Sequence, residues 1–149
     1  MNEMKVDVLV RELEDTDIGG ITALDEKIGG VYRPDTWEKR IGYYLRRDPE
    51  ALVVAELDDR VVGFMLGEVR SGEFGLDEPT GWIEVLGVDP DVRGQAIGRR
   101  MAERMLGHFR RRQATTVRTL VDDSMEDIGA FFSRIGFSEA PSKTLEMKL

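Results

Sequence analysis

Residues 88–100 of the chain, VDPDVRGQAIGRR, combine an arginine, two glycines and the start of a helical pattern in one short loop. The first turn of a helix has backbone N–H groups without partners and carries the positive end of the helix dipole. Glycine lets a ligand approach such a backbone closely. This combination is typical of phosphate sites, so we expect an anion to bind here. The loop matches neither the P-loop pattern G-x-x-x-x-G-K-[ST] nor the dinucleotide fingerprint G-x-G-x-x-G.

Glu84 is the second residue that could do chemistry, because it places a charge inside the apolar segment WIEVLGV, residues 82–88. A buried carboxylate costs several kcal/mol in a protein. Glu84 therefore needs a partner or an open cleft. It could act as a general base, lie on an open sheet face or form a structural ion pair. Glu68 and Asp122, near the ends of other expected strands, are weaker candidates for a base.

The composition excludes several other kinds of site. The chain has 149 residues, of which 41% are hydrophobic and 34% charged, and we expect one soluble domain over residues 1–149. The absence of cysteine excludes disulfides, thiolate zinc sites and cysteine nucleophiles. The single histidine, His108, is interpreted as a surface or half-buried helix residue. We therefore expect neither a histidine-rich metal site nor a Ser-His-Asp triad, and no bound metal.

The N-terminal residues contain no signal-peptide pattern, since they lack a basic start, a long apolar run and a small-residue cleavage site. No stretch approaches the roughly 20 apolar residues of a membrane span. The formal net charge is -8, which is unfavourable for sequence-independent binding of nucleic acid. We therefore expect a cytoplasmic protein that binds neither membranes nor nucleic acid.

Positive charge is concentrated in one part of this acidic chain. Between Asp91 and Arg112 there are seven arginines against two acidic residues. Such a basic island indicates an anionic ligand there and a cationic ligand elsewhere on the acidic remainder. The alternative interpretation is a solvated helix face.

The elements that would position these residues follow from hydrophobic periodicity and turn signals. Strands 2 to 4 follow one another without helices between them, which favours a mixed α+β sheet. We expect Ser124 and Asp127 to approximate a capping box at the start of the last helix. The expected strands are 6–13, two strands within 51–70 around the turn Asp58-Asp59-Arg60, 82–88 and 115–123. The expected helices begin near 15, 35, 97 and 124, and residues 137–149 form a closing hairpin around Pro141.

Two motifs resemble those of the GNAT superfamily of N-acetyltransferases. The loop Arg93–Gly98 resembles the family pattern R-x-x-G-x-G/A, and LGVDPDVRGQAIGRRM is similar to the family's V-x-P-x-x-R-G-x-G-I-G stretch. The segment SMEDIGAFFSRIGF is similar to the family's helix that ends in (F/L)-Y-x-x-x-G-F. The element order also matches, so the resemblance covers nearly the whole chain. It implies a mostly antiparallel mixed sheet of six to seven strands with about four helices.

The resemblance also implies a co-substrate, acetyl-coenzyme A. In this family the backbone N–H groups of the loop hold the pyrophosphate, a role that falls here on Arg93, Gly94, Gln95, Ala96, Ile97 and Gly98. Ala96, in a position usually held by glycine, is a mild departure because the backbone does the binding. Backbone groups of Leu86, Gly87 and Val88 would pair with the pantetheine arm where the fourth strand splays from the fifth, with a bulge at Gly87. Arg99 and Phe131 complete the implied cofactor site.

Acetyl transfer to an amine needs a base and an acid for the leaving thiolate. "IEVLGV" resembles the strand on which the family carries its proposed base, which implies this role for Glu84. The family's usual acid, a tyrosine, is replaced here by Phe132. Tyr32, Tyr43 and Tyr44 lie in the first two helices or their connection, and Ser124 and Ser133 are weaker candidates. Slow catalysis without a protein acid is the other alternative.

The sequence thus predicts an N-acetyltransferase that moves an acetyl group from acetyl-CoA to a primary amine of a small molecule or peptide, by direct attack in a ternary complex. The acidic remainder of the chain suits a cationic acceptor. Phe132 motivates an alternative, a non-catalytic acyl-CoA-binding or regulatory module, and a different acyl group or acceptor is a third. A homodimer is a further expectation, because GNAT proteins are commonly dimers. Loops 29–34 and 71–81 and the hairpin near Pro141 would face the acceptor.

Overall fold

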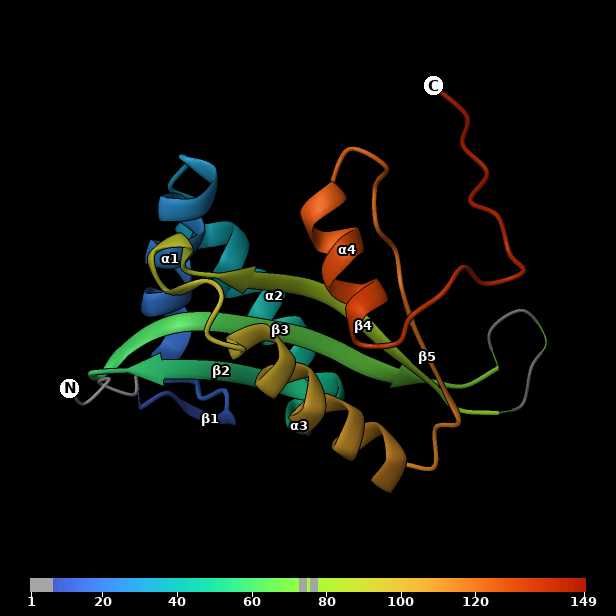
Figure 1. Cartoon of the computed structure of the whole chain (residues 1–149), viewed down its shortest axis with the longest axis horizontal. Coiled ribbons are helices and arrows are strands. Elements are labelled where there is room, and N and C mark those ends of the chain that lie inside the picture. Colours follow the sequence, from blue (N-terminus) through green and yellow to red (C-terminus); the bar gives the residue numbers. More distant parts are fainter. Residues whose placement is uncertain (1–6, 73–74, 76–77) are drawn as a thin grey trace.

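A five-stranded sheet runs through the centre of the computed structural model, which describes residues 7–72, 75 and 78–149 (Figure 1). The strands lie in sequence order, all neighbours are antiparallel except β4 and β5, and these two are parallel. Part of the expected acceptor loop 71–81 falls outside the described residues. The strands are β1 (Leu9–Glu12), β2 (Leu52–Leu57), β3 (Arg60–Arg70), β4 (Thr80–Val88) and β5 (Thr116–Thr119).

Helices cover both faces of this sheet, which explains why its central strands are apolar on both sides (Figure 1). On one face, α1 (Ile18–Gly29) and α2 (Pro34–Arg47) pack around buried residues such as Trp37 and Ile41. On the other face lie α3 (Ile97–Arg111) and α4 (Glu126–Arg134), which contribute to a second apolar cluster. The predicted α+β class and the four helices are confirmed.

The β2–β3 hairpin turns through Asp58 and Asp59, where a turn was expected. Both residues have positive φ angles, 51° and 58°, as a two-residue hairpin turn with the twist of the flanking strands requires. Aspartate tolerates this left-handed conformation better than most residues. The hairpin places β3 as the central strand between β2 and β4.

His108 is buried, and its interpretation as a surface or half-buried residue was wrong. It is 1% exposed, and its Nε2 atom lies 3.0 Å from Oδ1 of Asp48, which follows the last residue of α2. The reason is its place on α3, since Met101, Met105 and His108 recur at helical spacing on the face that packs against the sheet. A polar residue on that stripe is tolerated because Asp48 pairs with it.

Two expectations about the C-terminal part were also wrong. The capping box does not form, because the backbone N–H and the hydroxyl of Ser124 both donate to Oδ1 of Asp122, at 2.8 Å and 2.6 Å, and the helix begins two residues later. Residues 137–149 form no hairpin, since all of them are described and none lies in a strand. The described sheet therefore has five strands instead of six or seven, although the architecture is the expected one.

Candidate active site

The site begins where β4 and β5 separate. The two strands pair only between Thr80–Ile83 and Thr116–Thr119, although β4 continues to Val88. The hydroxyl of Thr119 donates to the carbonyl of Ile83 at 2.8 Å and marks the end of the pairing. Beyond this point β4 has no strand on its β5 side among the residues that the structure describes. The expected splay between the fourth and fifth strands is present.

Glu84 is the first residue beyond this pairing and sits in a β-bulge. Leu66 pairs with Val85 and Gly67 with Ile83, so Glu84 is the extra residue on β4. A β-carbon on Gly67 would lie 2.1 Å from the carbonyl oxygen of Trp82, so the bulge needs glycine opposite it. Bulges turn a side chain away from the regular alternation of a strand. Here the carboxylate turns toward α2.

A cleft of about 760 Å³ lies in this gap, lined by residues of α2, β4, α4 and the segment after β5. Glu84, Tyr44, Leu86 and Phe132 are among its lining residues. The Glu84 side chain is 25% exposed, so it is neither on an open sheet face nor sealed in the core. Glu84 therefore combines two of the environments that the sequence left open. It faces a cleft, and it forms an ion pair with Arg70.

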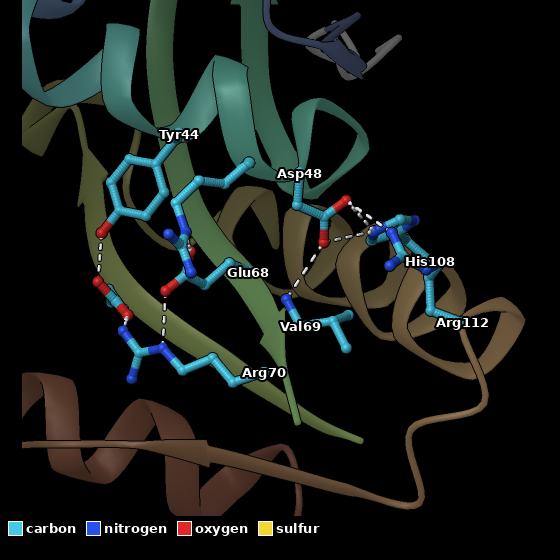
Figure 2. A network of polar contacts seen from close by, with 9 residues as sticks. Tyr44, Asp48, Glu68, Val69, Arg70, His108 and Arg112 are labelled. Carbon is cyan, nitrogen blue, oxygen red and sulfur yellow. Dashed lines mark hydrogen bonds and ion pairs between the residues drawn. The ribbon is translucent and has the colours of Figure 1, made fainter. Parts of the chain in front are cut away.

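Tyr44 and Arg70 hold the Glu84 carboxylate from two sides. The Tyr44 hydroxyl donates to Oε2 of Glu84, and the Arg70 guanidinium donates to Oε1 (Figure 2). Arg70 also stacks over the Trp82 ring, with its guanidinium carbon 5.2 Å from the ring centre. Because each carboxylate oxygen has its own donor, the orientation of the carboxylate is fixed.

Burial raises the pKa of Tyr44 above its ordinary value, and the nearby Glu68 carboxylate adds to this effect. The hydroxyl is therefore protonated at neutral pH and available as a donor. Tyr43 also lines the cleft, with its ring edge-on to Tyr44 at 5.2 Å. The third tyrosine, Tyr32, is 65% exposed and lies in the connection between α1 and α2.

The weaker base candidates Glu68 and Asp122 do not line the cleft. Glu68 is 1% exposed and bonded to two guanidinium groups, Nε of Arg47 at 2.6 Å and Nε of Arg70 at 2.7 Å. The side-chain and backbone hydrogen bonds from Ser124 lower the pKa of Asp122. Fixed donors hold both carboxylates away from the cleft, which leaves Glu84 as the acid that faces it.

The phosphate-loop candidate joins the end of β4 to α3 with its backbone exposed. Residues 93–96 are all exposed, and no side chain caps α3. Gly94 and Ala96 both have positive φ angles, 85° and 60°. This turn leaves the first N–H groups of a fifteen-residue helix without side-chain caps, the arrangement that favours an anion.

Ala96 is a more costly departure from glycine than its size suggests. Its left-handed φ of 60° costs a residue with a β-carbon roughly 1 kcal/mol. The methyl group of Ala96 takes little space, so the cost comes from the backbone conformation and not from the size of the side chain. The loop is otherwise firmly anchored. Asp89 before it accepts from Lys27 Nζ at 2.9 Å and from the amide of Asp91 at 2.9 Å.

These bonds to Asp89 are strong enough to set its charge. Burial alone would raise the pKa of the carboxyl, but the hydrogen bonds from Lys27 and from the Asp91 amide lower it below its ordinary value. Asp89 is therefore charged at neutral pH and ties the start of the loop to the last turn of α1. We infer that the loop is held in position before any ligand arrives.

The remaining residues assigned to the cofactor site lie close to this loop or line the gap. A β-carbon on Gly98 would lie 3.0 Å from the Phe131 ring, so Phe131 packs against the start of α3. Arg99 is exposed, whereas Arg100 donates to the backbone carbonyl of Val8 at 2.7 Å. Ile97 is a core residue, at 2% exposure, so its backbone alone is available to a ligand.

Leu86, Gly87 and Val88 form the part of β4 that runs beyond β5. Leu86 lines the cleft, and Val88 packs on the core on the α3 side. The expected bulge at Gly87 was wrong, because the bulge lies at Glu84. Gly87 is required for another reason, since a β-carbon there would lie 2.5 Å from the Phe64 ring.

Residues 19–137 match the family model described as "Acetyltransferase (GNAT) family". The chain belongs to the GNAT acetyltransferase family. The resemblance predicted from two motifs is thereby confirmed.

The fold of this GNAT chain matches solved structures along almost its whole length. The aminoglycoside N-acetyltransferase AAC(6')-Iy in complex with CoA has a TM-score of 0.82 at 15% identity, covering 99% of both chains. A structure described as a transcriptional regulator from Bacillus halodurans C-125 has a TM-score of 0.80 at 19% identity, covering 96% of this chain and all of that one. At such identities these likenesses show the GNAT fold alone.

Among curated proteins, the chain resembles mycothiol acetyltransferase of Thermobispora bispora. They are 33% identical over 91 residues, which make up 61% of this chain and 31% of that protein. The chain thus matches about a third of the length of this relative. The similarity places the GNAT chain near acetyltransferases but does not carry over the activity of the longer protein.

Sequence reasoning missed the two residues that hold Glu84 in this GNAT domain. Tyr44 lies on the buried face of α2 with Trp37 and Ile41, but the strand that it reaches cannot be read from the sequence. Arg70 stood at the expected end of a strand without any signal. Within the described part of the chain, no cluster of acidic or histidine side chains could hold a metal ion, and no helix is long and apolar enough to cross a membrane.

Proposed function

We propose that this GNAT domain transfers an acetyl group from acetyl-CoA to a primary amine of a small molecule or peptide, by direct attack in a ternary complex. The observation that carries the proposal is the position of Glu84, which faces a cleft at the point where β4 leaves β5. The uncapped start of α3 lies at the far end of the same strand. One strand therefore connects a candidate base with a candidate phosphate site.

In the proposed complex the donor is held largely by backbone. The exposed N–H groups between Arg93 and Gly98 bind the pyrophosphate, with Arg99 as an additional cation. The exposed backbone around Glu84 and the β4 residues 86–88 lie beyond the pairing with β5, so they can pair with the pantetheine arm as with an added strand. Phe131 supports this site by packing under Gly98.

Glu84 is proposed as the base. A primary amine is mostly protonated at neutral pH, so a carboxylate at the cleft is needed to receive its proton. The hydrogen bond from Arg70 orients the carboxylate, and no second carboxylate is among the cleft-lining residues that the structure describes. Glu84 first takes the ammonium proton and releases it to the solvent through the open side of the cleft, which leaves a neutral amine. As the nitrogen–carbon bond forms, the second amine proton passes to Glu84.

Tyr44 is proposed as the acid that replaces the family tyrosine lost at Phe132. The carbon–sulfur bond breaks, the thiolate takes the Tyr44 hydroxyl proton, and the proton held by Glu84 returns to Tyr44 across their hydrogen bond. The proton that the neutral amine loses on bond formation thus ends on the thiol, and both side chains regain their starting states. The raised pKa of Tyr44, caused first by burial, keeps the proton on the hydroxyl until the thiolate forms.

The acceptor is proposed to enter from the α2 side, where Lys39, Arg40 and Tyr43 line the cleft. The net charge of the chain favours a cationic acceptor. Lys39 and Arg40 in the cleft, however, would repel a cation and attract an anionic group. A cationic acceptor remains a prediction, and an amine that also carries a carboxylate is its direct competitor. A cytoplasmic location also remains a prediction.

Free thiol released from acetyl-CoA in the presence of an amine panel tests the proposal, with cationic and carboxylate-bearing amines in matched pairs. Turnover together with a thermal shift caused by coenzyme A supports an acetyltransferase. A thermal shift without turnover for any amine supports the alternative, a non-catalytic acyl-CoA-binding module motivated by Phe132. No thermal shift overturns the donor assignment.

Two glycines of α3, Gly98 and Gly107, provide a matched pair of variants that tests the loop. Valine at Gly98 would crowd the Phe131 ring, whereas Gly107 in the same helix has only the end of the Arg111 side chain nearby, at 3.4 Å. Gly98→Val should abolish the thermal shift caused by coenzyme A, and Gly107→Val should retain it. Equal behaviour of the two variants would contradict the assignment of the loop.

A further inference from the structure

The α2 wall of the cleft carries two cations, Lys39 and Arg40, that the proposed reaction does not use. Five residues of α2 line the cleft, and their helical spacing places them on one face: Thr36, Lys39, Arg40, Tyr43 and Tyr44. Glu84 is the one acid among the cleft-lining residues that the structure describes. A ligand in the cleft therefore meets a carboxylate at one place and positive charge along the neighbouring helix face.

Lys39 and Arg40 keep this positive charge, because no carboxylate of the described residues lies within ion-pair distance of either side chain. Asp25 is close enough to sense the charge of Arg40. Both oxygens of Asp25, however, already accept hydrogen bonds from Arg33, at 3.1 Å and 2.8 Å. In a chain of net charge -8, two cations that no acid neutralises, beside a candidate base, indicate an anionic group on the ligand.

Arg40 is the better positioned of the two cations. Its guanidinium carbon lies 5.2 Å from the centre of the Trp37 ring, and Trp37 is a core residue that gives the guanidinium a fixed support. A side chain that is already held loses less conformational entropy when it binds a ligand. Burial raises the pKa of Tyr44, and the charge of Arg40 opposes this rise. Arg40 therefore also lies within electrostatic reach of the hydroxyl that bonds Glu84.

These cations lie on the side of the sheet opposite to the proposed phosphate loop. The helices α1 and α2 cover one face of the sheet, and α3, which begins at the loop, covers the other (Figure 1). The phosphates of the donor are proposed to bind at the start of α3, so they do not neutralise Lys39 and Arg40. The anion that these two residues would bind therefore belongs to the acceptor, which is proposed to enter from the α2 side.

We propose that the acceptor is a primary amine with a carboxylate several bonds from its nitrogen, and that Arg40 binds this carboxylate with Lys39 as a second cation. The proposal rests on the proposed function, because it places the amine at Glu84. Tyr44, which bonds Glu84, is four residues beyond Arg40, a rise of about 6 Å along the helix. An α-amino acid holds its two charges side by side, whereas an ω-amino acid can span one helical turn. A guanidinium binds a carboxylate through parallel hydrogen bonds, which would fix the far end of the acceptor.

Matched pairs of amines test the proposal, each pair consisting of an amino acid and its primary amide. Glycine, γ-aminobutyrate and ε-aminocaproate increase the distance between the amine and the carboxylate. For at least one of the two longer compounds, kcat/KM should exceed that of the amide by about 10-fold or more, the usual effect of a charge-assisted hydrogen bond. For glycine, the carboxylate should give no such advantage. Arg40→Gln should raise KM for the preferred carboxylate about 10- to 100-fold, with kcat nearly unchanged, since Arg40 acts away from the reacting atoms.

Arg46→Gln is the matched control, since Arg46 is an exposed cation of the same helix that does not line the cleft. It removes the same charge and should leave KM unchanged. Both variants should retain the thermal shift caused by coenzyme A, which shows that they are folded. Equal turnover of carboxylates and amides, a preference for glycine, or equal effects of the two substitutions would overturn the proposal and leave the proposed function intact. No turnover with any amine would overturn both.

Discussion

Two carboxylates lie at the C-terminal end of α2. Asp48 directly follows the helix, and Glu84 accepts a hydrogen bond from Tyr44 in its last turn. Their surroundings differ in one respect. Asp48 is sealed, since its side chain is 5% exposed and surrounded by His108, Arg112 and the amide of Val69 (Figure 2). Glu84 is held just as firmly, by Tyr44 and Arg70, but one side of it opens to the cleft. Pairing alone therefore does not distinguish a structural acid from a reactive one.

The difference lies in what each acid can exchange. Around Asp48, groups of the protein occupy both carboxylate oxygens. Its contacts with His108 and Arg112 join the end of α2 to α3. Around Glu84 one donor is a hydroxyl, which can give its proton away and take one back. A hydrogen-bonded carboxylate beside a cleft is thus suited to proton transfer, whereas the same group inside the body holds elements together.

The largest effect is expected for Glu84→Gln, which keeps the shape of the side chain and removes the base. Turnover should fall about 100- to 10,000-fold, the usual contribution of a general base. The thermal shift caused by coenzyme A should be unchanged, because only the backbone at Glu84, and not its side chain, belongs to the proposed donor site. Turnover within twofold of the wild type would remove Glu84 as the base.

Asp48→Asn should lower the stability of the protein and leave its turnover unchanged, the opposite of Glu84→Gln. Removing the charge of a buried, hydrogen-bonded carboxylate destabilises a protein by about 2 kcal/mol, measurable by urea unfolding. Turnover of the folded variant should stay near that of the wild type. Arg112→Ala is the control, because Arg112 is 53% exposed and should cost less than about 1 kcal/mol. A folded Asp48→Asn variant without activity would erase the distinction between the two acids.

Tyr44→Phe separates an acid from a residue that only orients Glu84. We expect kcat to fall about 10- to 100-fold. Phe132→Tyr in the same variant should restore much of the loss, since Phe132 lines the same cleft. An acyl donor with a more acidic thiol should reduce the loss, because its thiolate needs less help to leave. A loss that neither change alters would assign Tyr44 to positioning alone.

A smaller effect is expected at Ala96, far from both acids. Glycine relieves the left-handed backbone of Ala96. The free energy of unfolding should rise by about 0.5 kcal/mol, since the relief of roughly 1 kcal/mol is offset by the greater freedom of glycine in the unfolded chain. Thermal and urea unfolding measure this change, and a loss of stability would show that the loop has another conformation.

The smallest effect is expected for the ion pair of Arg11 with Asp17, which involves neither Asp48 nor Glu84. Burial would raise the pKa of Asp17, but the hydrogen bond from Arg11, with that from the Glu14 amide, lowers it. A lowered pKa contributes stability above the ordinary value of 3.8, and this contribution is lost as the pH falls through and below it. Wild type should exceed Arg11→Gln in stability at pH 7 by less than about 1 kcal/mol, with the gap closing near pH 3. A gap that grows in acid would contradict this sign.

The sequence was sufficient for the fold and for the elements that carry the site. The loop Arg93–Gly98, the position of Glu84 and the splay of β4 from β5 all followed from local patterns or from the family resemblance. The partners of Glu84 did not, because Tyr44 and Arg70 meet it across 40 and 14 residues of sequence. The burial of His108 was predicted wrongly, because a polar helix residue is expected at the surface. Its partner Asp48 lies 60 residues away in the sequence and could not be anticipated. The register that puts the bulge at Glu84 depends on β3 and is likewise not local.

Amide NMR during a titration with coenzyme A tests the central claim most directly, since it locates the site without knowledge of the acceptor. The signals of Gly94, Gln95, Ala96 and Gly98 should shift, together with those of β4 beyond Ile83. The signals around Asp48 and His108 should stay unchanged. Shifts confined to the Asp48 region, or none at saturating coenzyme A, would contradict the assignment of this cleft and loop as the site.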